Sequence, residues 1–182
     1  WNKANKGSLV SIGKTFITPI HLYSNNYKSV KSLPDGATIA VPNDASNESR
    51  ALYVLQSAGL ITLKKNTNSL ATINSIAKNP KNLKIKEVAA DQAARTMDSV
   101  DAAVVNTNYA VAAKLSIKKS IFTEPVNKDS AQWINLIAAR KKDRNKEAYK
   151  DVVKAYQTEK VKKVINEQYN GLEKPAWDIK LK

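Results

Sequence analysis

The sequence has 182 residues, 42% of them hydrophobic, and a formal net charge of +14. This length is enough for one compact core or for two small lobes. The absence of cysteine excludes disulfides and thiolate metal sites, and no apolar run reaches the roughly eighteen residues that a membrane-spanning helix needs.

The positive charge favours an acidic partner, either nucleic acid or an anionic membrane surface. Its composition argues against nucleic acid, because only four of the 30 basic residues are the arginines that base and phosphate recognition favours. The lysines are spread along the chain. We therefore predict a solvated, lysine-rich surface, with a surface facing an anionic membrane as the alternative.

Strand-like and helix-like segments alternate along the chain. Apolar, β-branched or alternating patterns predict strands at 8–24 (broken at Pro19), 38–41, 83–90, 101–105, 121–125 and 130–141. Three- and four-residue apolar spacing predicts helices at 47–60, 69–79, 91–100, 107–115 and 146–169. A turn is expected at Pro34-Asp35-Gly36, and Trp177 should anchor a docking segment before a free end. This alternation predicts an α/β fold with a largely parallel sheet.

Ligands of such sheets bind where strands end at their carboxyl side. Three places fit: the loop and helix start after Val41, the polar Asn106 after the run AAVV, and Asn135 within WINLI. The first place holds Asn43, Asp44, Ser46 (a candidate N-cap), Asn47 and Arg50. These groups offer a cation, backbone donors and amides without a nucleophile, which suits a carboxylate and an ammonium group better than bond chemistry.

Arg50 raises a specific question, because a cation in the first turn of a helix faces the positive end of the helix dipole. A ligand carboxylate could compensate, and so could a core carboxylate such as Asp44 or Glu48. If a ligand does, Arg50→Ala should remove most affinity with little loss of folding. Asn106 could instead be a left-handed cap, and Asn135 could satisfy a neighbouring backbone group.

Other chemistry receives little support from the sequence. The single histidine, His21, lies in an apolar context and is expected to be structural. Metalloprotease, nucleophile-elbow, P-loop and dinucleotide-binding patterns are missing, and only five glycines are present. We therefore expect no catalytic residue, metal or cofactor.

Several segments, in this order, resemble the methionine-binding lipoproteins of ABC importers, the NlpA type. They are KTFITPIHLYS, IAVPNDASNESRALYVLQSAGLI, NPKNLKIKEV, DAAVVNTNYA, DSAQWINLIAARK and YNGLEKPAW. The spacing PND-x-x-N-x-x-R and the segment VNTNY are specific to that family. The resemblance covers nearly the whole chain.

The resemblance implies a periplasmic-binding-protein-like α/β fold in which hinge strands join two lobes and the ligand lies in the interlobe cleft. By this mapping, residues 1–24 are a remnant of lobe one and hinge, 25–131 form lobe two, and 132–182 are the hinge return and the rest of lobe one. Family members carry a further segment before the position of Trp1 that encloses the apolar ligand tail. We therefore expect lobe one to be incomplete and side-chain selectivity to be lost.

The resemblance also implies site residues and partners. Arg50 matches the arginine that binds the ligand carboxylate, Asn106 and Asn135 match amides that contact the head group, and Ser46 and Asn47 line the same loop. The ligand would be L-methionine, D-methionine, a methionine-containing dipeptide or a related amino acid. The partners would be an ABC transporter permease and the membrane, through an upstream lipidated cysteine in an extracytoplasmic protein. No nucleic acid is expected.

Two other classes of function stay open. An amino-acid-metabolising enzyme on a similar scaffold would need a general base, for which Asp44 is the nearby candidate. A basic surface-binding module for nucleic acid or lipid head groups would show steep salt dependence of binding.

Overall fold

The computed structural model describes residues 2–65, 70–169 and 172–179. The described chain divides into two compact units: unit 1 comprises Trp1–Thr18 and Val126–Lys182, and unit 2 comprises Pro19–Pro125. The chain thus enters unit 2 at Pro19 and leaves it at Pro125, six residues before each boundary expected from the sequence. The assignment of these units as lobes stays a prediction. No helix among the described residues is long and apolar enough to cross a membrane.

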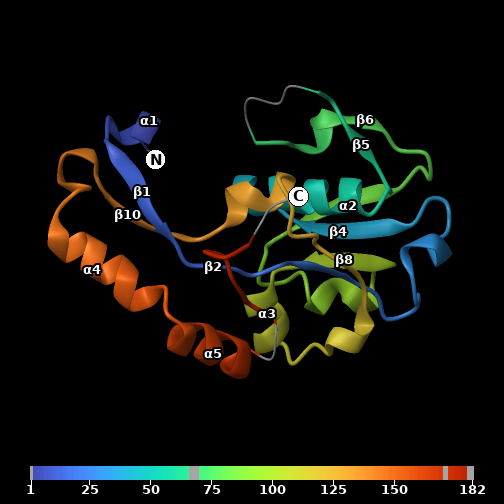
Figure 1. Cartoon of the computed structure of the whole chain (residues 1–182). Helices are drawn as coiled ribbons and strands as arrows, with labels where there is room; N and C mark the ends of the chain where they lie inside the picture. The colour runs from blue at the N-terminus through green and yellow to red at the C-terminus, as the bar shows by residue number, and fades with distance from the viewer. Residues whose placement is uncertain (1, 66–69, 170–171, 180–182) are drawn as a thin grey trace. The chain divides into compact units, whose positions relative to one another are not determined.

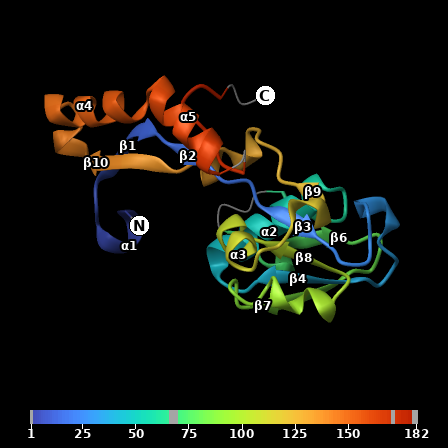
Figure 2. The same cartoon turned by 90° about the horizontal axis from the view of Figure 1, so that it is seen from below.

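Unit 2 (Figure 1) is built on a five-stranded sheet in the order β7-β4-β8-β3-β9, whose strands are labelled in Figure 2. Its strands are β3 (His21–Tyr23), β4 (Thr38–Pro42), β7 (Lys84–Val88), β8 (Ala102–Val105) and β9 (Ser120–Thr123). β4 pairs in parallel with β7 and β8, whereas β3 pairs antiparallel with β8 and β9.

The prediction of a largely parallel sheet is therefore wrong for the half of the sheet around β3. The reason lies in the register, because His21 at the start of β3 is opposite Thr123 at the end of β9. The chain enters unit 2 through β3 and leaves it through β9. Because both ends lie at the same edge of the sheet and the two strands are neighbours, they must be antiparallel.

Hydrophobic clusters cover both faces of this sheet. Helix α2 (Ala45–Ser57) packs Ala51, Leu52, Val54 and Leu55 into the larger cluster with Ile39 and Val41 of β4. On the other face, Ala40 and Tyr23 join Met97 and Ala110, the last from helix α3 (Thr107–Ala112). Alternate residues of β4 thus face opposite clusters, which is the period-2 alternation of a strand buried on both sides.

Three of the predicted elements of unit 2 differ in the structure. The predicted helix at 69–79 is wrong: Ile73–Ser75 forms one 3-10 turn, and Ile76–Lys78 (β6) pairs with Thr62–Leu63 (β5), while residue 69 lies outside the described residues. β-branched residues and the Ser75 hydroxyl, which accepts from Thr72 N–H, favour this turn over a helix. The segment 91–100 forms turns and a 3-10 helix at Arg95–Asp98, and α2 begins at Ala45 rather than at 47.

In its described residues, unit 1 has two short two-stranded ribbons and three α-helices, together with 3-10 turns (Figure 2). β1 (Leu9–Lys14) pairs antiparallel with β10 (Leu136–Arg140), and β2 (Phe16–Ile17) pairs antiparallel with β11 (Lys174–Pro175). The helices are α1 (Asn2–Asn5), α4 (Glu147–Tyr156) and α5 (Glu159–Gln168). The strand predicted over 130–141 is shorter than expected, because Asp129–Trp133 is a 3-10 helix.

The single helix predicted at 146–169 is two helices. The break falls at Gln157 and Thr158, where the Thr158 hydroxyl accepts from Val161 N–H and caps α5. α4 packs so closely on β1 that a Cβ on Gly13 would lie 2.9 Å from Val153 Cγ1. The expected docking of Trp177 is confirmed, since its ring lies edge-on to Tyr156, and the expected free end at 180–182 lies outside the described residues.

Candidate functional site

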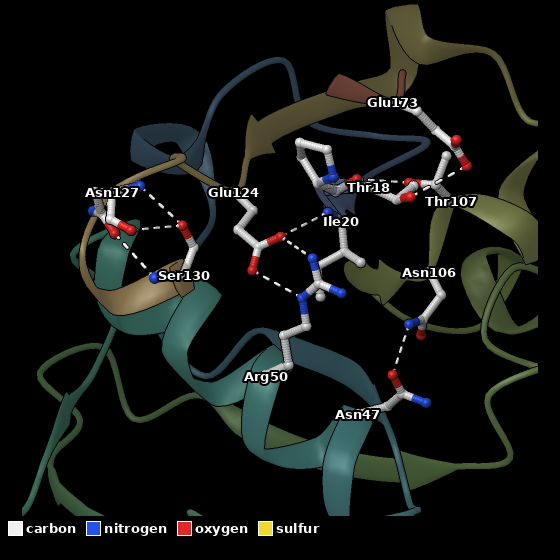
Figure 3. Close-up of polar contacts among 11 residues, drawn as sticks. Thr18, Ile20, Asn47, Arg50, Asn106, Thr107, Glu124, Asn127, Ser130 and Glu173 are labelled. Carbon is white, nitrogen blue, oxygen red and sulfur yellow. Dashed lines mark hydrogen bonds and ion pairs between the residues drawn. The ribbon is translucent and has the colours of Figure 1, made fainter. Parts of the chain in front are cut away.

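Two helices of unit 2 begin where neighbouring parallel strands end. β4 ends at Pro42 and leads into α2, and β8 ends at Val105 and leads into α3. Because parallel strands end at the same edge of a sheet, this brings the polar residues that follow them together. Asn47 of α2 and Asn106 before α3 are in direct contact (Figure 3).

Asp44, Asn47 and Asn106 form a short chain of hydrogen bonds. Asp44 is the N-cap of α2, and its carboxylate accepts from Asn47 N–H at 3.1 Å and from Asn47 Nδ2 at 3.0 Å. Asn47 Oδ1 then accepts from Asn106 Nδ2 at 2.8 Å. Because a carboxylate only accepts, it determines the orientation of both amides, with Asn106 Oδ1 at the end of the chain.

Asn106 Oδ1 is a buried acceptor that no donor satisfies among the described residues. The residue is 9% exposed, and its side chain does not cap α3 although it occupies the N-cap position. The left-handed cap considered above is excluded, since Asn106 has φ −63° and ψ 138°. A buried acceptor without a donor is costly, so this atom is suited to a ligand N–H.

Arg50 is paired with a residue that sequence spacing does not suggest. Its Nε donates to Glu124 Oε1 at 2.9 Å and its Nη2 to Glu124 Oε2 at 2.5 Å (Figure 3). The side chains are 12% and 5% exposed, so this is a buried bidentate ion pair. Glu124 therefore provides the compensation for Arg50 in this structure, and neither Asp44 nor Glu48 does.

Glu48 is engaged elsewhere. It is buried and accepts from Ile73 N–H at 3.0 Å. Burial raises the pKa of Glu48 above its ordinary value of 4.5, and the hydrogen bond from Ile73 opposes that rise.

The remaining predicted residues take no part in the hydrogen bonds described above. Ser46 is exposed inside the first turn of α2, and the N-cap expected there is Asp44 instead. Asn135 is exposed in unit 1 and precedes β10, where its backbone bonds Thr15 and Phe16. The placement of Asn135 inside a strand is therefore wrong. His21 is buried and its Nδ1 lies 3.0 Å from Thr123 Oγ1 and 3.2 Å from Ser120 Oγ.

Sequence reasoning missed Glu124 and Thr107. Glu124 is buried and Thr107 Oγ1 donates to the Pro19 carbonyl at 2.6 Å. The sequence does hold one signal for Glu124, because a carboxylate at the end of an apolar strand and directly before a proline calls for a cation. Thr107 carries no comparable signal.

Amides and a buried ion pair lie where strands of this α/β sheet end, which is the edge where open α/β sheets bind small molecules. The model of the NlpA lipoprotein family matches residues 1–177, and the chain belongs to that family.

Relatives and solved structures agree with this assignment. A probable D-methionine-binding lipoprotein MetQ of Pasteurella multocida is 44% identical over 170 residues, which cover 93% of this chain and 60% of the relative. Outer membrane lipoprotein 3 of Mannheimia haemolytica is 44% identical over 170 residues, 93% of this chain and 64% of the relative. The chain thus spans about three fifths of these relatives' length.

The substrate-binding protein of a methionine transporter from Streptococcus pneumoniae superposes with a TM-score of 0.80 and 49% identity, over 97% of this chain and 71% of that one. A nutrient-binding protein from Burkholderia cenocepacia bound to methionine gives 0.80 and 46%, over 96% and 73%. The predicted fold class, that of α/β substrate-binding proteins, is confirmed.

Proposed function

We propose that this chain is the substrate-binding component of an ABC importer for methionine or a short methionine-containing peptide. The observation that carries the proposal is Asn106 Oδ1, a buried acceptor beside the start of α2 to which the described part of the chain offers no donor. The names of the relatives supply the substrate class, because they include D-methionine-binding lipoproteins and a protein bound to methionine.

The two charges of an amino-acid head group match two features of unit 2. The ligand ammonium donates to Asn106 Oδ1, whose orientation Asp44 and Asn47 determine. The ligand carboxylate binds the guanidinium of Arg50. Glu124 engages the same guanidinium through Nε and Nη2 and so fixes its position for the ligand carboxylate.

The other predicted residues take secondary roles in this proposal. Asn47 acts through Asn106 by holding its amide, and Ser46 lies exposed on the same turn. Asn135 keeps the ligand contact that the family resemblance implies for it. Asp44 uses both carboxylate oxygens to cap α2 and hold Asn47, which disfavours the alternative in which it acts as the base of an enzyme.

The last step of the proposed function is delivery of the bound ligand to the membrane. The loaded protein presents its ligand to a membrane permease, and a lipid on an upstream cysteine holds it at the extracytoplasmic face of the membrane. The family description and the relatives' names as lipoproteins support this part.

Calorimetry with head-group analogues tests the function. L- and D-methionine are compared with methioninamide, which lacks the carboxylate, N-acetylmethionine, which lacks the ammonium, and norleucine, which keeps both. We expect each blocked analogue to bind at least about tenfold more weakly than methionine, because one charge-assisted hydrogen bond is lost. Equal binding of all five would refute the head-group grip.

A salt series separates the surface-binding alternative. Binding at a desolvated site should change little between low and moderate salt, whereas binding through surface lysines should weaken steeply. Steep salt dependence would favour the basic-module reading.

A further inference from the structure

Both places where the chain crosses between the units are tied to residues of the candidate site. The first crossing is Thr18-Pro19, directly before Ile20, and the second is Pro125-Val126, directly after Glu124. Glu124 joins them within unit 2: its Oε2 accepts from Ile20 N–H at 3.0 Å, and its own N–H donates to the Ile20 carbonyl at 2.9 Å. We call the hydrogen-bonded pair Ile20–Glu124 the crossing bracket.

Arg50 holds the crossing bracket from the side of α2. The same Oε2 that accepts from Ile20 N–H also accepts from Arg50 Nη2 (Figure 3). The Glu124 side chain is only 5% exposed, so its charge is costly without the guanidinium of Arg50 beside it. The carboxylate therefore stays in this position only while Arg50 does. The position of the guanidinium therefore sets the position of the bracket.

Thr107 forms a second tie from the side of α3. It directly follows Asn106, is buried, and donates through Oγ1 to the carbonyl of Pro19 at 2.6 Å. Since proline lacks an N–H, the backbone of Pro19 itself can be held only through its carbonyl. Asn106, the proposed contact of the ligand ammonium, is therefore next to Thr107, which binds Pro19 at the first crossing. Arg50, the proposed contact of the ligand carboxylate, forms an ion pair with Glu124, which precedes the second crossing.

We propose that Glu124 and Thr107 are positioning residues that couple ligand occupancy to the two chain crossings. This inference rests on the proposed function, because it takes the ligand to bind at Arg50 and Asn106. Ligand that binds only the arrangement with Arg50 docked on Glu124 stabilises the bracket against local opening. The crossings then become more ordered when the site is filled.

Hydrogen exchange of single amides measures this directly. The N–H groups of Ile20 and Glu124 are the two bracket hydrogens, and Pro19 and Pro125 contribute none. With L-methionine at one hundred times its Kd, exchange of both should slow about 100-fold if their opening abolishes binding. Ligand-independent exchange at Ile20 and Glu124, with binding shown by calorimetry, would overturn the inference and leave the proposed function intact. Absence of methionine binding would overturn both.

Two variants break the ties separately. Glu124→Gln removes the charge that holds Arg50, and Thr107→Val removes the hydroxyl at nearly constant volume. We expect methionine affinity to fall about tenfold in Glu124→Gln, and the ligand-dependent slowing at Ile20 to fall well below that of the wild type in both variants. Retention of the full slowing in folded, methionine-binding variants would show that the ties are only structural.

Matched controls lie in the same unit. Glu87→Gln removes an equal charge from an exposed position on β7. Thr96→Val removes another hydroxyl-to-carbonyl bond, from Thr96 Oγ1 to Ala93 at 2.8 Å. Both controls should keep the affinity and the slowing at Ile20; a loss of slowing in either would overturn the assignment to the crossing bracket. If Glu124→Gln does not fold, Thr107→Val carries the test alone.

Discussion

The two units differ in how they bury apolar surface. Unit 2 has a five-stranded sheet with a hydrophobic cluster on each face, and counted over the described residues the larger cluster has 17 buried members and the smaller has eight. In unit 1 the corresponding cluster has three, Ile17, Ile134 and Ala176, and α4 buries no residue fully. Unit 2 thus provides its own rigid support for the candidate site, whereas the elements of unit 1 are held by half-buried contacts.

The ion pairs of the two units also differ in how far they are buried. The Arg50–Glu124 pair of unit 2 is buried, whereas Lys162 of unit 1 pairs with Glu159 and Asp178, which are 85% and 59% exposed. Exposed pairs contribute little to stability, but breaking a buried pair leaves an uncompensated charge. The units should therefore respond very differently to similar substitutions.

The largest effect is expected from Arg50→Ala. Loss of the cation leaves the Glu124 carboxylate buried and unpaired, which costs about 3–5 kcal/mol of unfolding free energy. This reverses the expectation, drawn from the helix dipole alone, that the substitution would hardly affect folding. Urea unfolding followed by circular dichroism measures the loss, and Lys162→Ala in unit 1 should lose far less.

The double variant Arg50→Ala/Glu124→Ala serves as the control for that loss. Removing both charges should restore part of the stability, because the buried carboxylate is gone. An Arg50→Ala variant within about 1 kcal/mol of wild type would contradict a buried pair.

The next effect concerns the core. Leu52→Ala in unit 2 should cost about 3 kcal/mol through cavity formation, since the side chain is fully buried. Val152→Ala in α4, where Val152 is 53% exposed, should cost less than about 0.5 kcal/mol.

The tryptophans make this comparison sharper, because all three (positions 1, 133 and 177) belong to unit 1. If the units unfold separately, Leu52→Ala shifts the unfolding transition seen by circular dichroism. The transition seen by tryptophan fluorescence then stays at the same urea concentration. Equal shifts of both transitions would mean that the units unfold as one.

A smaller effect is expected on binding. Asn106→Ala should weaken L-methionine binding by about 1–2 kcal/mol, because the ligand ammonium loses an acceptor within a buried network. Asn135→Ala should cost about 0.5–1 kcal/mol, since the Asn135 side chain is exposed and water competes with the ligand. Calorimetry measures the L-methionine affinity of both variants. An unchanged affinity in Asn106→Ala would mean that Asn106 is not a ligand contact.

Local signals in the sequence were sufficient for much of unit 2. The fully apolar β8 and the switch to helix after Asn106 were predicted because burial and the change of period are visible within a few residues. The helix at 146–169 was predicted without its break, since the cap at Thr158 is a single hydroxyl within an otherwise continuous pattern.

The site was predicted less completely because its key partner is distant in sequence. Glu124 lies 74 residues from Arg50, and spacing along a chain gives no information about such a pair. The residues at strand ends could be grouped from topology, but the orientation of the Asn47 and Asn106 amides follows from Asp44, whose role depends on where α2 begins.

The smallest effect is a pH dependence that compares the buried Glu48 of unit 2 with the half-buried Glu173 of unit 1. Burial raises the pKa of Glu48 in unit 2 and of Glu173 in unit 1 above the ordinary value of 4.5, and a hydrogen bond from Thr18 opposes the rise for Glu173. Between 4.5 and the raised pKa, the folded state binds more protons than the unfolded state. The contribution of each group to stability therefore decreases as the pH rises through that window.

Glu48→Gln should accordingly gain stability relative to wild type as the pH rises from about 4.5 towards 7, and Glu173→Gln should do the same. Urea titrations at several pH values give the difference between variant and wild type, which cancels the other carboxylates. The tryptophan signal should carry the Glu173 difference, because Trp133 and Trp177 lie in unit 1, whereas the Glu48 difference should appear only in the circular dichroism. A pH-independent difference for Glu48→Gln would mean that its pKa is not raised, and that the bond from Ile73 cancels the effect of burial.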